Sequence, residues 1–296
     1  MPILGDLGRQ LVQRWAALLA LPGLLLAAAA MAGTALGQRH PFDRGRLADR
    51  ADQAARSFAD RPPSVQLLLV AALLLAVAAA GVVVEAAAGV TLTGWLGPWP
   101  RVLSGPGRWL TDRRETHWLA AQQRVSALES AYPAPRAAAE RREIDEAAAA
   151  REAIAPARPA RPTWMGDRVA GADIRVLNQY GLDLAAVWPR LWLILPDEVR
   201  TEVAAARTRI EEAARLATWA VPFVLVAVVW WPAAVIAAVP ALSGWRRGRA
   251  AAATYGLLLE STVDVHAGAL ATRLGEDPGL QLETGRALTR RLKKGS

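Results

Sequence analysis

The chain contains no cysteine and almost no lysine. Without a thiol it has no disulfide, no thiolate zinc site, no cysteine-ligated iron–sulfur cluster and no cysteine nucleophile. Of its 35 basic residues only Lys293 and Lys294 are lysine, and together with the excess of alanine this indicates the coding bias of a high-GC genome. The abundance of arginine therefore carries little information about function.

Catalytic motifs are missing as well. The sequence has no G-x-S-x-G elbow, no H-E-x-x-H pair, no phosphate-binding P-loop and no dinucleotide-binding G-x-G-x-x-G. Its three histidines, His40, His117 and His266, are far apart, and no acid and base stand at a spacing suited to catalysis. The sequence predicts a protein that is not an enzyme and that has no catalytic, cofactor-binding or metal-binding residues.

Long apolar runs are present instead. Hydrophobic residues make up 53% of the chain, and Ala, Leu and Val gather in runs long enough to span a bilayer core of about 30 Å. Many arginines flank these runs, so the net charge of +8 favours contact with anionic lipid headgroups over nucleic-acid binding. These features predict an all-α integral membrane protein with about four transmembrane helices, arranged as two hairpins, and a cytoplasmic helical domain.

Residues 1–99 are expected to form an N-terminal transmembrane hairpin and an interfacial segment. The first helix covers about residues 15–37, although a cleaved signal sequence is an alternative, because small residues precede Gly33 as they do at a cleavage site. Ala29, Gly33 and Gly37 recur every fourth residue, a spacing that lets two helices pack closely.

The second helix of this hairpin is expected over about residues 65–85, so that Glu85 falls near the far membrane interface. An ionisable residue in a transmembrane segment is a candidate for function. Glu85 shares a helix face with Ala78 and Gly81, where a neighbouring helix can pack closely. A carboxylate that merely reaches the lipid headgroups is the simpler alternative. The Trp-, Gly- and Pro-rich residues that follow are expected to lie along the interface as an aromatic belt.

A third apolar stretch, residues 216–249, crosses the membrane either once or twice. A single helix over residues 216–245 would be about 45 Å long and would bury Trp230, Trp231 and Pro232 at the midplane. A turn at residues 230–232 instead brings the tryptophans to the interfaces, where this residue is enriched. We therefore expect a transmembrane hairpin.

The distribution of arginine also favours two crossings, because the hairpin collects more arginines on one side of the membrane. Both termini and the long middle segment are then cytoplasmic, and the protein is a multi-pass protein of the bacterial inner membrane. Six arginines between residues 39 and 61 conflict with this rule, since they lie on the outer side. Four nearby aspartates offset them only in part.

Residues 100–215 form the expected cytoplasmic domain, with a Pro/Ala-rich spacer at residues 132–162. After the spacer, Gly181 can end a helix, Asp183 can cap the next, and Pro196 precedes a third. Large apolar side chains in this part form either a small hydrophobic core or a surface for a partner. They are Trp164, Tyr180, Trp188, Trp192, Leu193 and Leu195.

Residues 250–296 are expected to form an amphipathic helix and a basic tail. The apolar stripe consists of Tyr255, Leu259, Val263, His266, Leu270 and Leu274. Glu260, Asp264 and Ala271 fall opposite, which indicates a helix at the membrane interface or against the middle domain. Glu260 and Asp264 are one turn apart, but His266 points elsewhere, so no metal-ligand cluster forms. A solvated acidic face is expected.

Several short motifs occur in a characteristic order: PTWMGDR, YGLD, VWPRLW and LPDE, then a hairpin and TYGLLLESTVDVH. This order resembles that of a group of uncharacterised four-helix membrane proteins of high-GC bacteria, over about residues 160–275. The resemblance implies the membrane hairpin and a cytoplasmic middle domain. It implies no known activity, so it assigns no site residue.

These features together predict a membrane-embedded scaffold, sensor or effector that oligomerises and contacts partners through its cytoplasmic domain. The expected partners are the lipid bilayer with its anionic headgroups, a second copy of the chain, or another membrane or cytoplasmic protein, and not nucleic acid. A homo-oligomeric channel or membrane-disrupting pore is the alternative, because each subunit needs only one polar face. A lipid-acting enzyme is less favoured, since a nucleophile and its base are missing.

Overall fold

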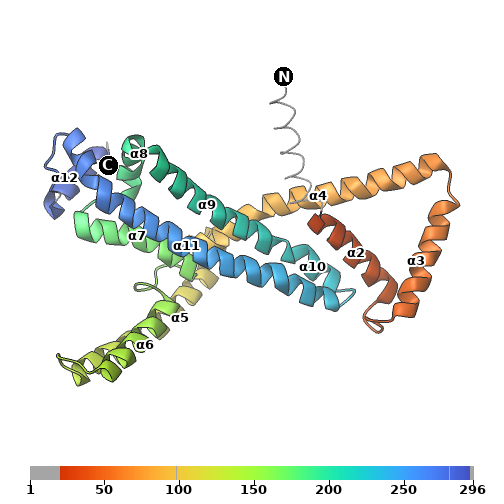
Figure 1. The fold of residues 1–296 in the computed structure, drawn as a ribbon, viewed down its shortest axis with the longest axis horizontal. Coiled ribbons are helices and arrows are strands. Elements are labelled where there is room, and N and C mark those ends of the chain that lie inside the picture. Colours follow the sequence, from red (N-terminus) through yellow and green to blue (C-terminus); the bar gives the residue numbers. More distant parts are fainter. Residues whose placement is uncertain (1–20, 98, 280, 294–296) are drawn as a thin grey trace. The chain divides into compact units, whose positions relative to one another are not determined.

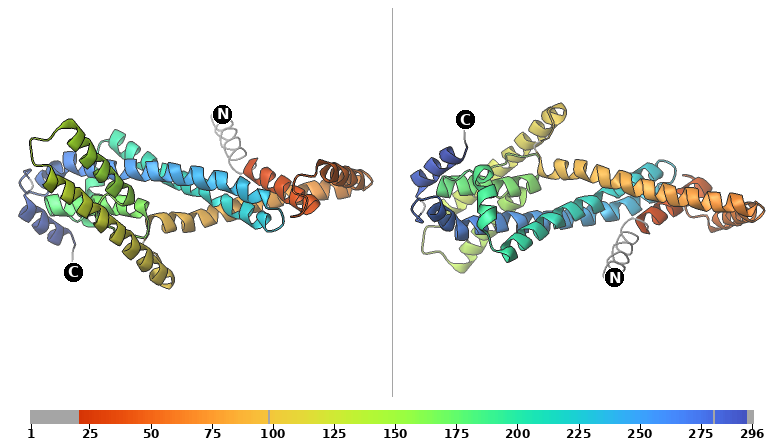
Figure 2. Two further views of the ribbon diagram at one scale, coloured as in Figure 1. Left: turned by 90° about the horizontal axis from the view of Figure 1, so that it is seen from below. Right: turned by 90° about the horizontal axis from the view of Figure 1, so that it is seen from above.

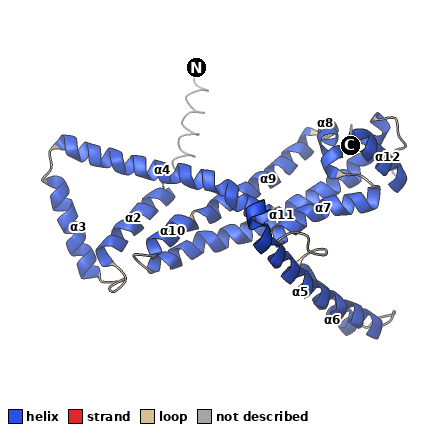
Figure 3. Cartoon of the chain, turned by 180° about the vertical axis from the view of Figure 1, so that it is seen from behind, coloured by secondary structure: helices blue, strands red, loops and turns tan. Residues whose placement is uncertain are grey.

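The computed structural model describes residues 21–97, 99–279 and 281–293, and every regular element in these ranges is a helix (Figure 3). This confirms the expected all-α class. The first six residues of the helix expected over residues 15–37 lie outside the described residues. The chain divides into two compact units. Unit 1 comprises Met1–Thr91 and Glu212–Arg246, and unit 2 comprises Leu92–Glu211 and Arg247–Ser296.

Unit 1 is built from apolar helices and one polar helix. Its elements are α2 (Leu21–Leu36), α3 (Arg44–Ala59), most of α4 (Pro63–Leu96), the end of α9 (Asp197–Thr218), α10 (Ala220–Ala227) and the start of α11 (Pro232–Arg273) (Figure 1). Within the described ranges, only α4 is long and apolar enough to cross a membrane by length and composition, while α2 is apolar but shorter. Only 17% of the most apolar part of α4 is buried, whereas the core helix of a soluble protein is mostly buried.

The helix α4 is longer than the sequence indicated. It begins at Pro63, a position where the missing N–H of proline is tolerated, and it continues past Glu85 to Leu96. Most of the segment that was expected to lie along the interface is therefore helical, because its alanines favour the helix and nothing stops it before the prolines that follow Gly97.

The chain reverses between α10 and α11. Ala220 and Phe223 of α10 share a buried cluster with Ala237 of α11. Farther from the turn, a Cβ on Gly244 would lie 2.8 Å from the Cβ of Ala217, so these two positions are in contact as well. The two arms therefore run antiparallel from a turn at residues 228–231, and both views of Figure 2 show them side by side. This turn coincides with the position expected at residues 230–232.

The helix α11 does not end where the expected hairpin ended, at residue 249. It continues to Arg273, so the second hairpin arm and the expected amphipathic helix are one continuous helix of 42 residues. The sequence RRGRAAAATYG at the expected boundary contains no proline and is rich in alanine and arginine, both strong helix formers.

Unit 2 contains the remaining helices. They are η2 (Arg101–Leu103), α5 (Ser104–Ala131), α6 (Ala138–Ile154), α7 (Trp164–Tyr180), α8 (Leu184–Ile194) and α12 (Leu282–Leu292), together with the rest of α9 and α11. Its core joins α7, α8, α9, α11 and α12 through buried residues that include Val176, Leu191, Val203, Val263 and Leu288. The C-terminal half of α11 thus packs against the middle domain, one of the two locations expected for it.

The spacer expected at residues 132–162 is wrong as a description of α6. This helix packs along α5 to form a helical hairpin (Figure 1), and Ile144 and Ala147 of α6 and Val125 of α5 are buried. The side chain of Arg151 also donates a hydrogen bond of 2.8 Å to Gln122 of α5. The sequence was misleading because α6 buries only two apolar side chains, too few to stand out in an Ala-, Arg- and Glu-rich segment.

The boundaries between α7, α8 and α9 are confirmed. Gly181 ends α7 in the left-handed conformation (φ 70°), and Asp183 caps α8 by accepting a hydrogen bond from the backbone N–H of Ala186. A Cβ on Gly181 would come within 2.3 Å of the carbonyl oxygen of Leu282 in α12. Glycine is therefore required here both for the turn and for the close approach of α12.

The helix α8 offers a matched test of this core. We expect Leu191→Ala to lower the free energy of unfolding by about 2–5 kcal/mol, because Leu191 is fully buried and its truncation leaves a cavity. Leu193→Ala on the same helix should change it by less than about 0.5 kcal/mol, because Leu193 is 76% exposed. Denaturant unfolding of the detergent-solubilised protein measures both values, and equal losses would contradict this core.

Candidate functional site

Glu260 was expected on a solvated acidic face of its helix, and this expectation is wrong. Its side chain is 5% exposed and accepts hydrogen bonds from Arg168 (2.6 Å) and Arg175 (2.5 Å) of α7. Gly256, one turn earlier on α11, lets α7 approach closely, since a Cβ there would lie 2.9 Å from the carbonyl oxygen of Arg168. The helical wheel places Glu260 opposite the apolar stripe but does not indicate that α7 covers this side too. Ala271, expected on the same face, is also buried.

The ion-pair network continues to Asp264. Arg175 lies 3.8 Å from its carboxylate, and the hydroxyl of Tyr180 donates a hydrogen bond of 2.8 Å to the same group. Burial, followed by the hydrogen bond to Asp264, raises the pKa of the Tyr180 hydroxyl. His266 does not join this network, because its Nδ1 lies 3.2 Å from the carbonyl oxygen of Thr262 on its own helix. Arginine side chains neutralise the two carboxylates.

A second buried carboxylate, Asp167, connects three segments of unit 2. Its Oδ2 accepts a hydrogen bond of 2.6 Å from Arg114 of α5, and its Oδ1 accepts bonds from the backbone N–H groups of Ala160 and Arg161. Arg114 in turn donates to the carbonyl oxygens of Ile154 and Arg161, at 2.6 Å each. These contacts hold the Pro- and Ala-rich residues 155–162 between α5 and α7. The sequence offered no signal for this pair, because 53 residues separate its two members.

Glu85, the candidate intramembrane carboxylate, forms an ion pair within unit 1. Both of its oxygens accept hydrogen bonds from Arg215 of α9, at 2.5 and 2.9 Å. Close by, the hydroxyl groups of Thr91 and Thr218 lie 2.8 Å apart. Glu85 is therefore paired with a positive charge from a neighbouring helix.

The packing face of α4 differs in part from the expected one. Gly81 is buried, but Ala78, which was expected to share its face, is exposed. The buried stripe instead runs through Val77, Gly81, Val84 and Ala88. A Cβ on Gly23 of α2 would lie 2.6 Å from Val77, so α2 packs closely on this stripe.

The turn between α10 and α11 meets the loop that follows α2. The side-chain amide of Gln38 donates hydrogen bonds to the carbonyl oxygens of Ala227 (2.9 Å) and Val228 (2.7 Å) and accepts one from the N–H of Trp231 (3.1 Å). The indole of Trp230 donates to the carbonyl oxygen of Pro41 at 3.0 Å. One polar side chain thus satisfies the backbone groups that α10 leaves free at its end.

Gly33 takes part in the same junction, since a Cβ there would lie 3.1 Å from the Cβ of Trp230. Ala29, one turn earlier, belongs to the buried cluster of α10 and α11. The expected small-residue face of α2 is thus used for packing at these two positions. Gly37 does not belong to it, because this glycine (φ 64°) follows the last residue of α2 and would meet no neighbour with an added Cβ.

The aromatic residues of unit 2 separate into two groups. Tyr180, Trp188 and Trp192 pack against the hydrophobic core without being fully buried, and the two tryptophan rings lie 5.8 Å apart. Trp164 lies elsewhere: its indole donates to the carbonyl oxygen of Glu152, and the guanidinium of Arg249 lies 4.1 Å from the centre of its ring. Tyr180, Trp188 and Trp192 therefore belong to the edge of the hydrophobic core, the first of the two alternatives for these side chains.

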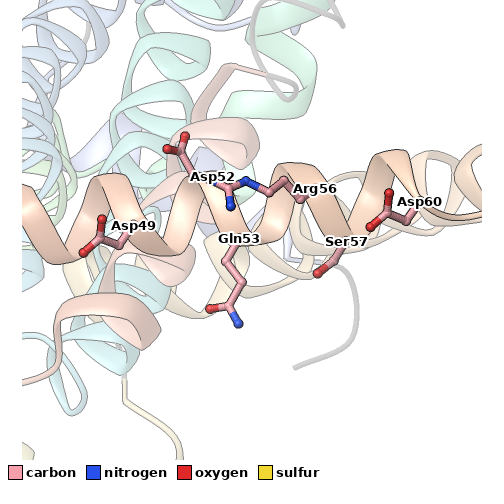
Figure 4. A pocket seen from close by; sticks show the side chains of 6 residues that line it. All are labelled: Asp49, Asp52, Gln53, Arg56, Ser57 and Asp60. Atoms are coloured by element: carbon pink, nitrogen blue, oxygen red, sulfur yellow. The ribbon is translucent and has the colours of Figure 1, made fainter.

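A shallow hollow along α3 is lined by polar side chains of that helix and of its C-cap residue (Figure 4). They are Asp49, Asp52, Gln53, Arg56, Ser57 and Asp60. Among the described residues, the lining comes from this helix and its cap alone, so the hollow is one face of a helix and not an enclosed pocket.

No protein-family model matches this chain, and neither a curated protein nor a solved structure is significantly similar to it. The resemblance to four-helix membrane proteins of high-GC bacteria therefore stays a prediction. Within the described residues, no group of three or more His, Cys, Asp or Glu side chains could hold a metal ion. The geometry of these residues supports structural ion pairs and packing surfaces.

The buried network of Glu260 provides a quantitative test. Glu260→Gln should lower the free energy of unfolding by about 3–5 kcal/mol, because it leaves the mostly buried Arg168 without its counter-charge. Glu276→Gln is the control, since it removes a more exposed pair with Arg291 at 3.7 Å and should cost less than about 1 kcal/mol. Similar losses for the two variants in denaturant unfolding would show that the Glu260 pair does not stabilise the fold.

A pH-dependent contribution to stability is expected where Lys293, the residue after α12, meets the N-cap of α8. Lys293 lies 2.6 Å from the carboxylate of Asp183, and its hydrogen bond lowers the pKa of Asp183 below the usual 3.8. Because the folded-state pKa is depressed, the pair stabilises the protein above about pH 3.8, and this contribution is lost as the pH falls through the folded-state value.

Lys293→Met should therefore lower the melting temperature slightly at neutral pH and should make no difference well below pH 3.8. The effect is below about 1 kcal/mol, because the Lys293 side chain is half exposed. Lys293→Arg is the control that keeps the charge. A difference from the parent protein that is the same at both pH values would contradict this assignment.

Proposed function

We propose that the chain is a multi-pass membrane protein in which α2, α4, α10 and the start of α11 cross the bilayer and the residues of unit 2 are cytoplasmic. In this proposal it works as a scaffold, sensor or effector that oligomerises and contacts partners, without catalysis. The observation that carries the proposal is the junction between the loop after α2 and the turn between α10 and α11.

This junction favours two crossings over one in residues 216–249. In a single crossing, Trp230 would lie at the midplane of the membrane. The loop it contacts contains Gln38, Arg39 and His40, and irregular polar backbone of this kind is not found facing lipid in the hydrocarbon core. In a hairpin, the loop and the turn lie together at one membrane interface, where tryptophan is enriched.

The second interface is marked by Glu85 and Arg215. Between Pro63 and Glu85, α4 rises by about 33 Å, which matches a hydrocarbon core of about 30 Å. From Arg215 to the turn the first hairpin arm rises by only about 20 Å. The flanking arginines must therefore snorkel towards the interface, or the bilayer must thin beside the hairpin.

The surface of unit 1 supports contact with lipid. Large apolar side chains are exposed along all of its proposed membrane helices, and among them are Leu25, Leu68, Leu75, Val82, Leu225 and Val239. Exposed apolar side chains in this number favour aggregation in water. Lipid chains are a suitable environment for it.

Two features bear on the choice between a pore and a scaffold. Arg215 neutralises Glu85, which leaves this carboxylate poorly suited to attract ions as a pore-lining charge. In unit 2, Ile174 and Leu177 on α7 and Leu193 on α8 expose apolar side chains to a potential partner. Both features favour the scaffold, sensor or effector.

Cysteine labelling tests this topology, because the natural chain contains no cysteine. Val229→Cys in the turn and Gln53→Cys in α3 should react on intact cells with a membrane-impermeant maleimide, since both positions are exposed. Ala138→Cys at the start of α6 is exposed too but should react only after the cells are lysed.

A single crossing predicts a different pattern. Val229→Cys would then be buried in lipid and would not react in either condition. Ala138→Cys would still lie on the opposite side of the membrane from Gln53→Cys, because α4 separates the two positions. The distribution of arginine would no longer place Ala138 in the cytoplasm. Reaction of Ala138→Cys on intact cells together with silence of Val229→Cys would overturn the hairpin and the cytoplasmic partner function.

A further inference from the structure

The helix α3 is exposed along its whole length. All 16 of its residues lie outside any core, although Asp43 caps its N-terminus through a hydrogen bond of 3.0 Å from the N–H of Arg46. A helix of about this length is only marginally stable in water without tertiary packing. Some other contact is therefore needed to stabilise α3.

One face of α3 is apolar. Leu47, Ala51, Ala54 and Phe58 follow the i, i+4, i+7, i+11 spacing and so fall within about 60° of one another around the helix axis. Leu47 is 40% exposed and Phe58 is 38% exposed, so no part of the described chain covers this stripe fully.

Most charged residues around this stripe are distributed by sign, and Arg56 is the exception, because it lies among the aspartates on the polar face. Arg44 and Arg50 flank it on its two sides, about 60° from its centre line. The aspartates at positions 49, 52 and 60 lie on the opposite side, in the polar hollow of Figure 4. Cations beside the apolar face and acids away from it are the pattern of a helix that lies on a phospholipid surface.

The neighbours of α3 in the chain point to the same surface. Residues 37–43 join it to α2, and residues 60–62 join it to α4, so both of its ends are tied to apolar helices with exposed leucine side chains. Beside its first turn, the rings of Phe42 and Trp231 pack edge to face, 5.7 Å apart. Aromatic side chains of this kind mark the membrane interface.

We infer that α3 lies in the plane of the membrane surface, with Leu47, Ala51, Ala54 and Phe58 in the lipid and with Arg44 and Arg50 against phospholipid phosphates; this inference rests on the membrane topology proposed above. It also accounts for arginines that conflict with the positive-inside rule. Arg44 and Arg50 bind headgroup phosphates, and Arg46 lies beside Asp43 at 3.6 Å.

Spin labels test this inference in the full-length protein. A nitroxide label is attached to one cysteine at a time, in vesicles of equal parts phosphatidylethanolamine and phosphatidylglycerol. The labelled variants are Ala51→Cys and Ala54→Cys on the stripe and Gln53→Cys on the polar face. Power saturation then measures the collisions of each label with oxygen, which concentrates in lipid, and with a water-soluble nickel chelate. The oxygen-to-nickel ratio should be several-fold higher at positions 51 and 54 than at position 53.

Charge variants test the contact with phosphate. Replacing Arg44 and Arg50 together by glutamine should lower the oxygen-to-nickel ratio at position 51, because the stripe loses its attraction to the anionic surface. Arg56→Gln, in the centre of the polar face, is the matched control and should leave the ratio unchanged. The same ratio in the double variant and in the parent protein would overturn the role of the two arginines.

Two results would overturn the lipid contact. If positions 51, 53 and 54 collide equally with the nickel chelate, α3 lies in water. If positions 51 and 54 are shielded from both reagents, a second copy or another protein covers the stripe. Leu74→Cys in α4, where Leu74 is 57% exposed, distinguishes a failure of this inference from a failure of the proposed topology. If a label at position 74 collides with oxygen in lipid, the membrane topology stands. If it collides with the nickel chelate instead, the membrane topology is wrong.

Discussion

Arginine–carboxylate pairs between helices that are distant in the sequence are the contacts on which the helix arrangement depends. Glu260 joins α11 to α7, Asp167 joins α7 to α5, and Glu85 joins α4 to α9. Glu260 and Asp167 are buried. A buried carboxylate that lost its arginine would cost several kcal/mol, so a shift of α7 relative to α11 or α5 is strongly disfavoured. The planar guanidinium holds both oxygens of Glu85 and bridges three acceptors around Asp167, which the ammonium of lysine would do less well.

In unit 1, polar groups of the backbone need partners just as the buried carboxylates do. The end of α10 leaves carbonyl groups without helical partners, and no water satisfies them if the helix is surrounded by lipid. Gln38 supplies the missing donors from the loop after α2, and the indole of Trp230 satisfies Pro41 in return. The two turns thereby stabilise each other. In the proposed topology, the apolar stripe of the next helix, α3, then lies at the membrane surface, where tryptophan and arginine are favoured.

Features that depend on a few neighbouring residues were predictable. Gly181 and Asp183 mark the end of α7 and the start of α8, because a left-handed glycine and an N-cap aspartate act within one helical turn. The stripe through Leu259, Val263 and Leu270 is buried, as its period indicated. The continuous helix over residues 232–273 was missed although its signal was local, since hydropathy changes at residue 249 while helix propensity does not.

By itself, the sequence determined the all-helical class, the apolar runs and the reversal near residue 230. Only the tertiary structure decided what the charged side chains do. Periodicity divides a helix into an apolar and a polar face, but it does not reveal whether a second helix covers the polar face, as α7 covers Glu260. The partners Arg114 and Asp167, and Glu85 and Arg215, are 53 and 130 residues apart, and a pairing over such distances follows from the packing of whole helices. The same reason explains α6, whose small buried face acquires meaning only when α5 lies beside it.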